Sequence, residues 1–166
     1  MISSPTMRTS GEGGSALVIR HVAVGFLYHA DSGRVLLHLR AADGPPSARR
    51  WAFFGGDSEP EAGDDLPATW CREMREELGV ALDPASIVSL RHDTYADGSP
   101  WHEYDAAWPT PAEDFALTEG QRYGWFTLAA ALALPDLAEH ALGSVDASRE
   151  RLACEHCVVV PPVDQL

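Results

Sequence analysis

The sequence predicts an α+β fold in which helices pack around a mixed β-sheet. Stretches rich in branched and aromatic residues are joined in pairs by short turns, so we expect hairpins and not a strict β-α-β alternation. One amphipathic stretch at residues 67–78 lies between these pairs and indicates a helix with an apolar face. With 166 residues, the chain is long enough for one domain with a substantial core.

Residues 16–41 are expected to form the first hairpin. The segments 16–30 and 34–41 are apolar and rich in branched residues, and Asp-Ser-Gly between them is a turn signal. Residues 1–15 have neither the basic start nor the apolar run of a secretory signal, and we expect a disordered leader there. A single domain is then expected over residues 16–166.

A buried strand and a helix are expected next. Residues 51–54, Trp-Ala-Phe-Phe, predict a short strand that ends at the paired glycines Gly55 and Gly56. Pro67 suits the first turn of a helix, and Gly79 is expected to stop that helix.

The second half of the chain predicts a second strand pair, a further strand and a helical end. Residues 86–96 and 101–108 flank the turn Asp-Gly-Ser-Pro, and residues 122–128 have the composition of another strand. Residues 129–145 have a helical pattern that Pro135 interrupts.

The charge balance excludes several classes of phosphate-binding protein. The formal net charge is −13, and all twelve basic residues are arginine, because the chain contains no lysine. Without lysine there is no P-loop lysine, no kinase-type ATP lysine and no Schiff base. The acidic balance also argues against binding to duplex DNA or RNA. Phosphate groups are therefore expected to be bound through arginines and metal ions.

No membrane partner is expected, because no stretch approaches the roughly 20 apolar residues of a membrane helix. We expect a cytoplasmic protein. Cys71, Cys154 and Cys157 do not make a disulfide framework, and reduced thiols are expected, with Cys71 facing the core. Cys154 and Cys157 have the spacing of half a zinc site, but the other half is missing.

At about 100° per residue, the predicted helix has two faces of different chemistry. One face carries the side chains that would pack into the protein, Trp70, Cys71, Met74 and Leu78. The opposite face carries three carboxylates, Glu73, Glu76 and Glu77. Like charges at these spacings destabilise a helix by roughly 0.2–0.5 kcal/mol per pair, and they raise one another's pKa unless a cation lies between them.

Two interpretations of the carboxylates are open. They could form an ordinary solvated face, with Arg72 and Arg75 as partners within the helix. The strand and the paired glycines before the helix favour a metal site, because a backbone carbonyl can then approach whatever the acids bind. Clustered carboxylates and a carbonyl provide hard oxygen ligands, which suit Mg²⁺ or Mn²⁺ and not zinc. We therefore expect a metal site.

Residues 72–80, Arg-Glu-Met-Arg-Glu-Glu-Leu-Gly-Val, resemble the second half of the Nudix signature at every position, and this half is highly specific. The first half departs from the signature. Asp64 stands at the position of the family's glutamate and is a shorter acid. Seven residues separate Gly56 from Asp64, where the signature has five, so the loop carries two extra residues.

Three further segments resemble the MutT branch of the Nudix family. Residues 23–43 are similar to its opening hairpin and the Arg-Ala-Ala-Asp that follows, residues 51–56 to its strand into the paired glycines, and residues 118–126 to its Glu-Gly-Gln segment. The resemblance covers roughly residues 20–128. It implies a Nudix-type α/β/α sandwich around the mixed sheet.

The resemblance implies metal ligands and catalytic acids. Gly55 would offer its backbone carbonyl, and Glu76 and Glu77 would be direct carboxylate ligands. Glu73 would bind a metal directly or through water, or help to deprotonate that water. Glu119 would be a further ligand or base.

The resemblance also implies a substrate contact and two structural residues. Arg40 would contact the nucleotide. Arg72 would orient the helix acids by a salt bridge, and Asp64 would have a positioning role within the signature.

The implied activity is Mg²⁺-dependent hydrolysis of the pyrophosphate linkage of a nucleoside diphosphate derivative, with Mn²⁺ as a substitute metal. The MutT resemblance favours a nucleoside triphosphate, including an oxidised guanine nucleotide of the 8-oxo-dGTP type, cleaved to monophosphate and pyrophosphate. Hydrolysis of ADP-ribose, a nucleotide sugar or a dinucleoside polyphosphate is an alternative, and the cues at Tyr95 and Pro100 do not decide between them. A non-catalytic Nudix module that binds a nucleotide is a further alternative.

The expected partner is a small-molecule nucleotide, but the residues that would read its base stay open. The asparagine that the MutT branch uses is absent, because the chain contains none. Its role could fall to Asp136, Glu139 or His140. Stacking on the base could fall to Trp51, Trp101 or Trp108. The oligomeric state is also open, with a dimer among the alternatives.

Overall fold

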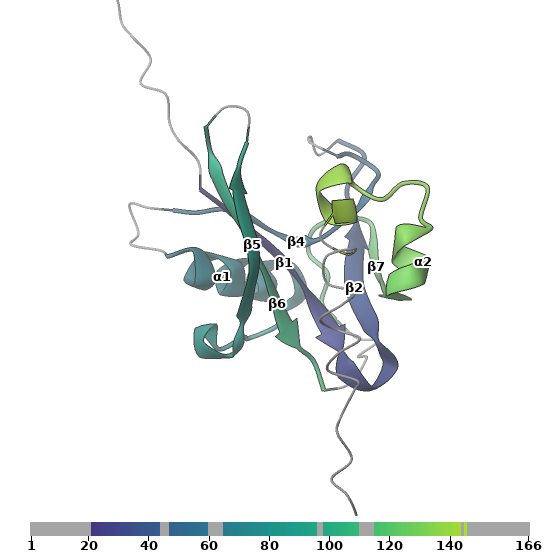
Figure 1. Cartoon of the computed structure of the whole chain (residues 1–166), viewed down its shortest axis with the longest axis horizontal. Helices are drawn as coiled ribbons and strands as arrows, with labels where there is room; N and C mark the ends of the chain where they lie inside the picture. The colour runs from purple at the N-terminus through teal and green to yellow at the C-terminus, as the bar shows by residue number, and fades with distance from the viewer. Residues whose placement is uncertain are drawn as a thin grey trace, which may run out of the picture.

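The computed structural model describes residues 21–43, 47–59, 65–95, 98–109, 115–143 and 145. The expected leader at 1–15, the acid Asp64, and Cys154 and Cys157 lie outside these residues. Figure 1 shows a central sheet with α1 (Leu66–Leu78) on one side and α2 (Leu128–Leu132) on the other. The predicted α+β sandwich around a mixed sheet is confirmed.

The sheet starts from the predicted hairpin. β1 (Val22–His29) and β2 (Arg34–Leu39) pair antiparallel beside their turn. β6 (Pro100–Ala107) lies parallel to β1, and β5 (Val88–Thr94) lies antiparallel to β6 at the edge. β7 (Arg122–Thr127) pairs antiparallel with β2. The parallel β1–β6 pair among antiparallel neighbours makes the sheet mixed.

The segment 51–57 corrects the prediction of one strand that ends at the glycines. β1 and β2 pair near their turn, and the chain then supplies each of them with a separate short partner. β3 (Trp51–Ala52) pairs with β2, and β4 (Phe54–Asp57) pairs with β1. Gly55 and Gly56 lie inside β4, opposite Val24 and Ala23 of β1. The glycines are therefore part of the sheet.

Both faces of the sheet are buried, so successive residues of its inner strands point into different cores. Phe26 and Leu37 face the core on the α2 side. Leu27 and Leu36 face the core under α1. Because side chains alternate between the faces of a strand, a strand that is buried on both sides is apolar at every position. This explains the uninterrupted apolar runs of the first hairpin.

α1 begins and ends close to the predicted residues. Asp65 caps its N-terminus by accepting a hydrogen bond from the backbone N–H of Ala68 at 2.7 Å, and Gly79 ends it with a left-handed φ of 71°. Trp70 on its buried face stacks on Tyr104 of β6, with ring centroids 5.9 Å apart. These contacts fix the rotation of α1 against the sheet, and with it the directions of the helix acids.

The remaining short elements lie between the strands and after α2. The 3₁₀ helices η1 (Ala30–Ser32) and η3 (Pro84–Ser86) lie before β2 and β5. Residues 139–143 are helical, and Pro135 separates them from α2, as predicted. Cys71 is buried, also as predicted. Within the described part of the chain, every helix is too short or too polar to cross a membrane.

Asp65→Ala removes the acceptor for the Ala68 backbone N–H and should lower the free energy of unfolding by about 1 kcal/mol. Asp65→Asn keeps a capping oxygen and should cost clearly less. Urea denaturation followed by circular dichroism measures both variants. Equal losses would show that the charge of Asp65, and not its capping bond, stabilises α1.

Candidate active site

Glu77 is a deeply buried acid on α1, with an exposed fraction of only 2 %. Its Oε1 accepts a hydrogen bond from the backbone N–H of Gly55 at 3.1 Å. Its Oε2 has no hydrogen-bond partner among the described residues. The helical pattern placed Glu77 on the face opposite the core, and this is wrong, because α1 also lies against β4 at this turn.

The paired glycines of β4 allow α1 to approach the strand. Gly55 has a φ of 136°, a backbone conformation that residues with a side chain rarely adopt. An added Cβ at this position would also collide with the carbonyl oxygen of Ala23. An added Cβ at Gly56 would lie 2.8 Å from Oε1 of Glu73. Each glycine therefore faces one acid of the helix. The Gly55 N–H donates to Glu77, and the missing side chain of Gly56 leaves room for Glu73.

Arg72 pairs with the two other acids of α1. Its Nη1 lies 2.9 Å from Oε1 of Glu73 and 3.0 Å from Oε2 of Glu76. Its Nη2 donates to the backbone carbonyl of Asp57 at 3.0 Å. Arg72 therefore ties the acids to the end of β4, although the side chain of Glu76 stays 59 % exposed.

The loop before β7 places Glu119 beside α1. The backbone N–H of Thr118 donates to the carbonyl of Glu77 at 2.9 Å, and the Thr118 hydroxyl donates to the carbonyl of Glu76 at 2.5 Å. The side-chain amide of Gln121 donates to the carbonyl of Arg40 at 3.0 Å. The loop is thus bonded to the end of α1 and to the end of β2, and the exposed Glu119 lies between these two attachments.

The acids raise one another's affinity for protons. Burial raises the pKa of Glu77 to about 8, and the negative charges of Glu119 and Glu73 act in the same direction. Burial also raises the pKa of Glu73, together with the charges of Glu76 and Glu119, and Arg72 offsets this only in part. Raised carboxyl pKa values show that the charged form is disfavoured, here first by burial and then by the neighbouring acids.

His38 of β2 is a neighbour that the sequence analysis did not single out. It is 3 % exposed, its ring packs against Phe54 with centroids 4.5 Å apart, and its Nδ1 lies 3.7 Å from Oε2 of Glu77. Burial and the charge of Arg40 lower the pKa of His38 to about 4, so the imidazole is neutral at pH 7. The sequence signal for it is a histidine in the middle of an apolar strand.

Most of the predicted site residues come together around the contact between α1 and β4. The helix acids and Gly55 form the contact itself. Glu119 and Arg40 lie close enough to shift the pKa of Glu77 in opposite directions. Asp64 lies outside the described residues.

The three helix carboxylates do not point together as the sequence led us to expect. Glu76 turns toward Arg72, and Glu77 turns toward Gly55. Within the residues that the structure describes, no three carboxylate, imidazole or thiol groups stand in a metal-binding arrangement. Binding of a cation to all three acids therefore requires their side chains to reorient.

Comparison with known proteins gives the family. The NUDIX domain matches residues 19–146, more than half of the chain. The chain belongs to the Nudix family. The predicted class, a Nudix pyrophosphohydrolase, is confirmed, as is the family resemblance drawn from residues 72–80. Among curated proteins, no sequence matches this chain.

Solved structures share the Nudix fold. The Nudix domain of Shewanella oneidensis NrtR, complexed with ADP ribose, is 27% identical with a TM-score of 0.63, over 87% of this chain and 94% of that one. A MutT protein from Methanosarcina mazei is 20% identical with a TM-score of 0.60, over 80% and 95% of the two chains. A C. elegans Ap4A hydrolase is 22% identical with a TM-score of 0.61, over 80% and 98%. The similarities to the MutT protein and to the Ap4A hydrolase show the fold alone. These comparisons do not assign the chain to the MutT branch.

Nudix hydrolases use a divalent metal cation, and the acids of this chain fit one. Oε2 of Glu77 is buried without a hydrogen-bond partner among the described residues. Burial and the neighbouring acids raise the pKa values of Glu77 and Glu73, and a bound cation would offset both effects. The available ligand atoms are oxygens, which hard divalent cations prefer.

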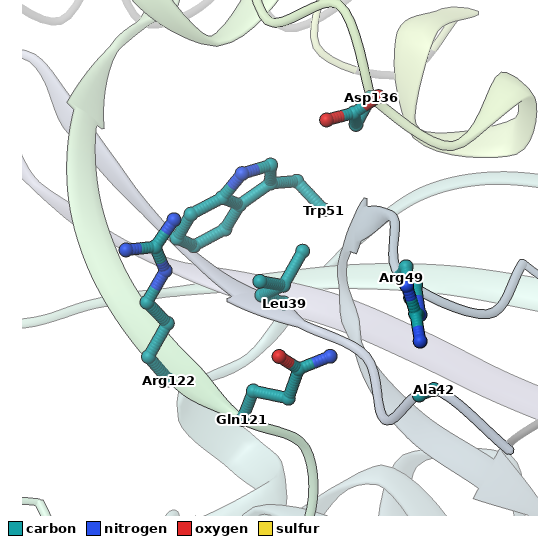
Figure 2. Close-up of a pocket in the computed structure, with 7 residues that line it drawn as sticks. All are labelled: Leu39, Ala42, Arg49, Trp51, Gln121, Arg122 and Asp136. Atoms are coloured by element: carbon teal, nitrogen blue, oxygen red, sulfur yellow. The ribbon is translucent and has the colours of Figure 1, made fainter.

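A pocket lies where β2, β3 and the start of β7 meet. Its volume is about 440 Å³, and it is lined by Leu39, Ala42, Arg49, Trp51, Gln121, Arg122 and Asp136. Figure 2 shows the Asp136 carboxylate on the opposite side of this space from Gln121. The guanidinium of Arg122 lies over the Trp51 ring, 5.3 Å from its centroid. Gln121 links the pocket to the acids, because it follows Glu119 by two residues in the same loop.

The pocket brings together two of the residues considered for base recognition. Asp136 and Trp51 both line it, although they lie 85 positions apart in the sequence. Trp101 lies elsewhere, under the guanidinium of Arg91 at 4.9 Å. Trp108 does not line the pocket either.

Glu77→Gln should flatten the pH dependence of stability between pH 6.5 and 8 in EDTA. The pKa of Glu77 is 4.5 when unfolded and about 8 when folded. Its contribution to the free energy of unfolding is therefore fully present below pH 4.5 and is lost as the pH rises through 8. His38 acts with the opposite sign, between its folded pKa of about 4 and its ordinary value of 6.5, so the window above pH 6.5 separates the effect of Glu77 from that of His38. Urea denaturation at a series of pH values measures this. A parallel decline in both proteins would contradict the assignment.

Proposed function

We propose that the chain is a Mg²⁺-dependent Nudix hydrolase that cleaves the pyrophosphate linkage of a nucleoside diphosphate derivative. The first candidate is a nucleoside triphosphate, released as monophosphate and pyrophosphate. The contact between Glu77 and Gly55 carries this proposal, because it buries a carboxylate oxygen without a partner among the described residues, beside further acids.

We assign the metal ligands from the oxygens that remain available. Glu77 offers Oε2, since its Oε1 accepts from Gly55. Glu73 and Glu76 each offer the oxygen that Arg72 does not contact. Gly55 would add its backbone carbonyl. Mn²⁺ is expected to replace Mg²⁺, because both cations accept a set of oxygen ligands.

The cation, when bound, neutralises phosphate oxygens and lowers the pKa of a water molecule. We assign Glu119 as the base that accepts the proton of the attacking water, with Glu73 as the alternative. Arg40 is assigned to the phosphates, because a guanidinium donates paired hydrogen bonds to such oxygens. With a net charge of −13, the metal-free protein does not attract a phosphate-rich substrate, so substrate binding should need the cation.

The pocket in Figure 2 supports a nucleoside as part of the substrate. Its volume of about 440 Å³ lies in the range of roughly 300–1,000 Å³ that is usual for small-molecule sites. Asp136 can only accept hydrogen bonds when ionised, and Arg49 and Arg122 can only donate them. Bases that carry both donors and acceptors, guanine among them, match this combination. An oxidised guanine nucleotide is therefore kept among the candidates.

ADP-ribose is the second candidate substrate. The NrtR domain, at 27% identity, was solved in complex with ADP ribose. ADP-ribose carries the same pyrophosphate linkage, so the same acids would serve. Its hydrolysis would release AMP and a ribose phosphate but no inorganic pyrophosphate, which separates the two candidates by their products.

A panel of nucleoside triphosphates, oxidised dNTPs, ADP-ribose, nucleotide sugars and dinucleoside polyphosphates tests the proposal, with Mg²⁺ and with EDTA. We expect Mg²⁺-dependent release of pyrophosphate from nucleoside triphosphates. Glu76→Gln and Glu77→Gln should each lower kcat at least about a hundredfold, because even loss of groups that only support metal ligands costs roughly 10–100-fold. Asp31→Asn, in the exposed turn after β1, is the control and should keep wild-type turnover.

Turnover within a few fold of wild type in both glutamine variants would contradict the metal site. Nucleotide binding by the wild type without any turnover would favour the non-catalytic alternative.

Asp136→Asn tests the pocket as the base site. If Asp136 pairs with the donors of guanine, the variant should lose about 1–3 kcal/mol of discrimination, roughly 5- to 150-fold in kcat/KM for guanine relative to other bases. Glu139→Gln is the control, since Glu139 is an exposed acid three residues on that does not line the pocket. An equal loss for every base would mean that the pocket does not read the base through Asp136.

A further inference from the structure

His38 is a buried polar side chain that the proposed function leaves without a role. It is 3 % exposed and belongs to a strand in which Val35, Leu36 and Leu37 are fully buried apolar residues. Its ring nitrogens have no partner at full hydrogen-bond geometry among the described residues, and only weaker backbone interactions with Phe53 and Glu119 act on the ring. A buried polar group whose hydrogen bonds fall short of full geometry destabilises the fold, and an apolar side chain would avoid this cost. Core packing alone therefore does not explain an imidazole at this position.

The ring of His38 is held by the elements that carry the site. It packs against Phe54, the first residue of β4. An added Cβ at Gly120 would lie 3.3 Å from its Nδ1, so the loop that carries Glu119 closes over the ring. The same Nδ1 lies 3.7 Å from Oε2 of Glu77, the oxygen that lacks a partner among the described residues.

We propose that His38 is a positioning residue for Glu77, whose Oε2 accepts a hydrogen bond from the His38 Nδ1–H when the carboxylate is ionised. The proposal rests on the proposed function, in which Glu77 holds the metal. A shortening of about 0.7 Å from the observed 3.7 Å gives the N···O distance of roughly 3.0 Å that is typical of a hydrogen bond. Gly55 then fixes Oε1 and His38 fixes Oε2 through one lone pair each. The remaining lone pairs stay available for the cation.

A neutral donor suits this position better than a cationic one. An arginine beside Oε2 would neutralise Glu77 and compete with the metal ion. A neutral imidazole orients the carboxylate without cancelling its charge, which is the usual part of groups that support metal ligands. The arginine of the cluster, Arg72, instead pairs with Glu73 and Glu76.

Mn²⁺ binding by the full chain without substrate tests the proposal, because free Mn²⁺ gives an electron paramagnetic resonance signal that is lost on binding. His38→Leu removes the donor at similar volume and should weaken Mn²⁺ binding about 10- to 100-fold. His38→Asn keeps an N–H donor near the position of Nδ1 and should bind Mn²⁺ nearly as the wild type does. His102→Leu is the control, since this histidine packs against His92 on the β5–β6 pair and should not affect binding.

Urea denaturation in EDTA separates positioning from packing. His38→Leu should be at least as stable as the wild type, so weaker Mn²⁺ binding with undiminished stability supports the proposal. Wild-type Mn²⁺ affinity in His38→Leu would overturn it, as would equal weakening in His38→Leu and His38→Asn. A wild-type chain that binds no Mn²⁺ would overturn the metal site itself, and this assignment with it.

Discussion

The close approach of α1 to β4 is the constraint on which the site depends. A side chain at Gly55 would collide with the backbone of β1, and one at Gly56 would displace Glu73. With both positions free of side chains, the Gly55 N–H reaches one oxygen of Glu77. Burial keeps water from the other oxygen, and the pKa of Glu77 rises to about 8. The ionised form of Glu77 is therefore disfavoured at this contact, and a cation bound there would stabilise it.

The charges around this contact are distributed unevenly. Arg72 lies on the exposed side, where it pairs with Glu73 and Glu76 and anchors them to β4. On the buried side, the neighbour of Glu77 is the imidazole of His38, which burial and Arg40 keep neutral at pH 7. The outer acids therefore have an arginine ion pair, whereas among the described arginines the inner acid has no such pair and is affected only by the charge of Arg40. This division accounts for a site that a divalent ion can complete.

The loop between residues 115 and 121 joins the acids to the pocket. Its hydrogen bonds from Thr118 attach it to the end of α1, and its hydrogen bonds from Gln121 attach it to the end of β2. Gln121 also lines the pocket that contains Asp136. A nucleotide with its phosphates at the acids and its base in the pocket would lie along this loop. The positions of the two groups are then coupled through the hydrogen bonds that this loop donates, from backbone and side chain, to backbone carbonyls.

The sequence by itself determined the features that local chemistry controls. Pro67 and Gly79 bound the helix, the turn at residues 31–33 defines the hairpin, and the spacing within residues 72–80 gives the family. These follow from backbone preferences and fixed spacings within a few residues. Only the tertiary structure decided that residues 51–57 divide between two partner strands and that Glu77 is buried. It also brought His38 beside Glu77 and Trp51 into one pocket with Asp136. These outcomes depend on contacts between residues far apart in the chain, and no local pattern carries that information.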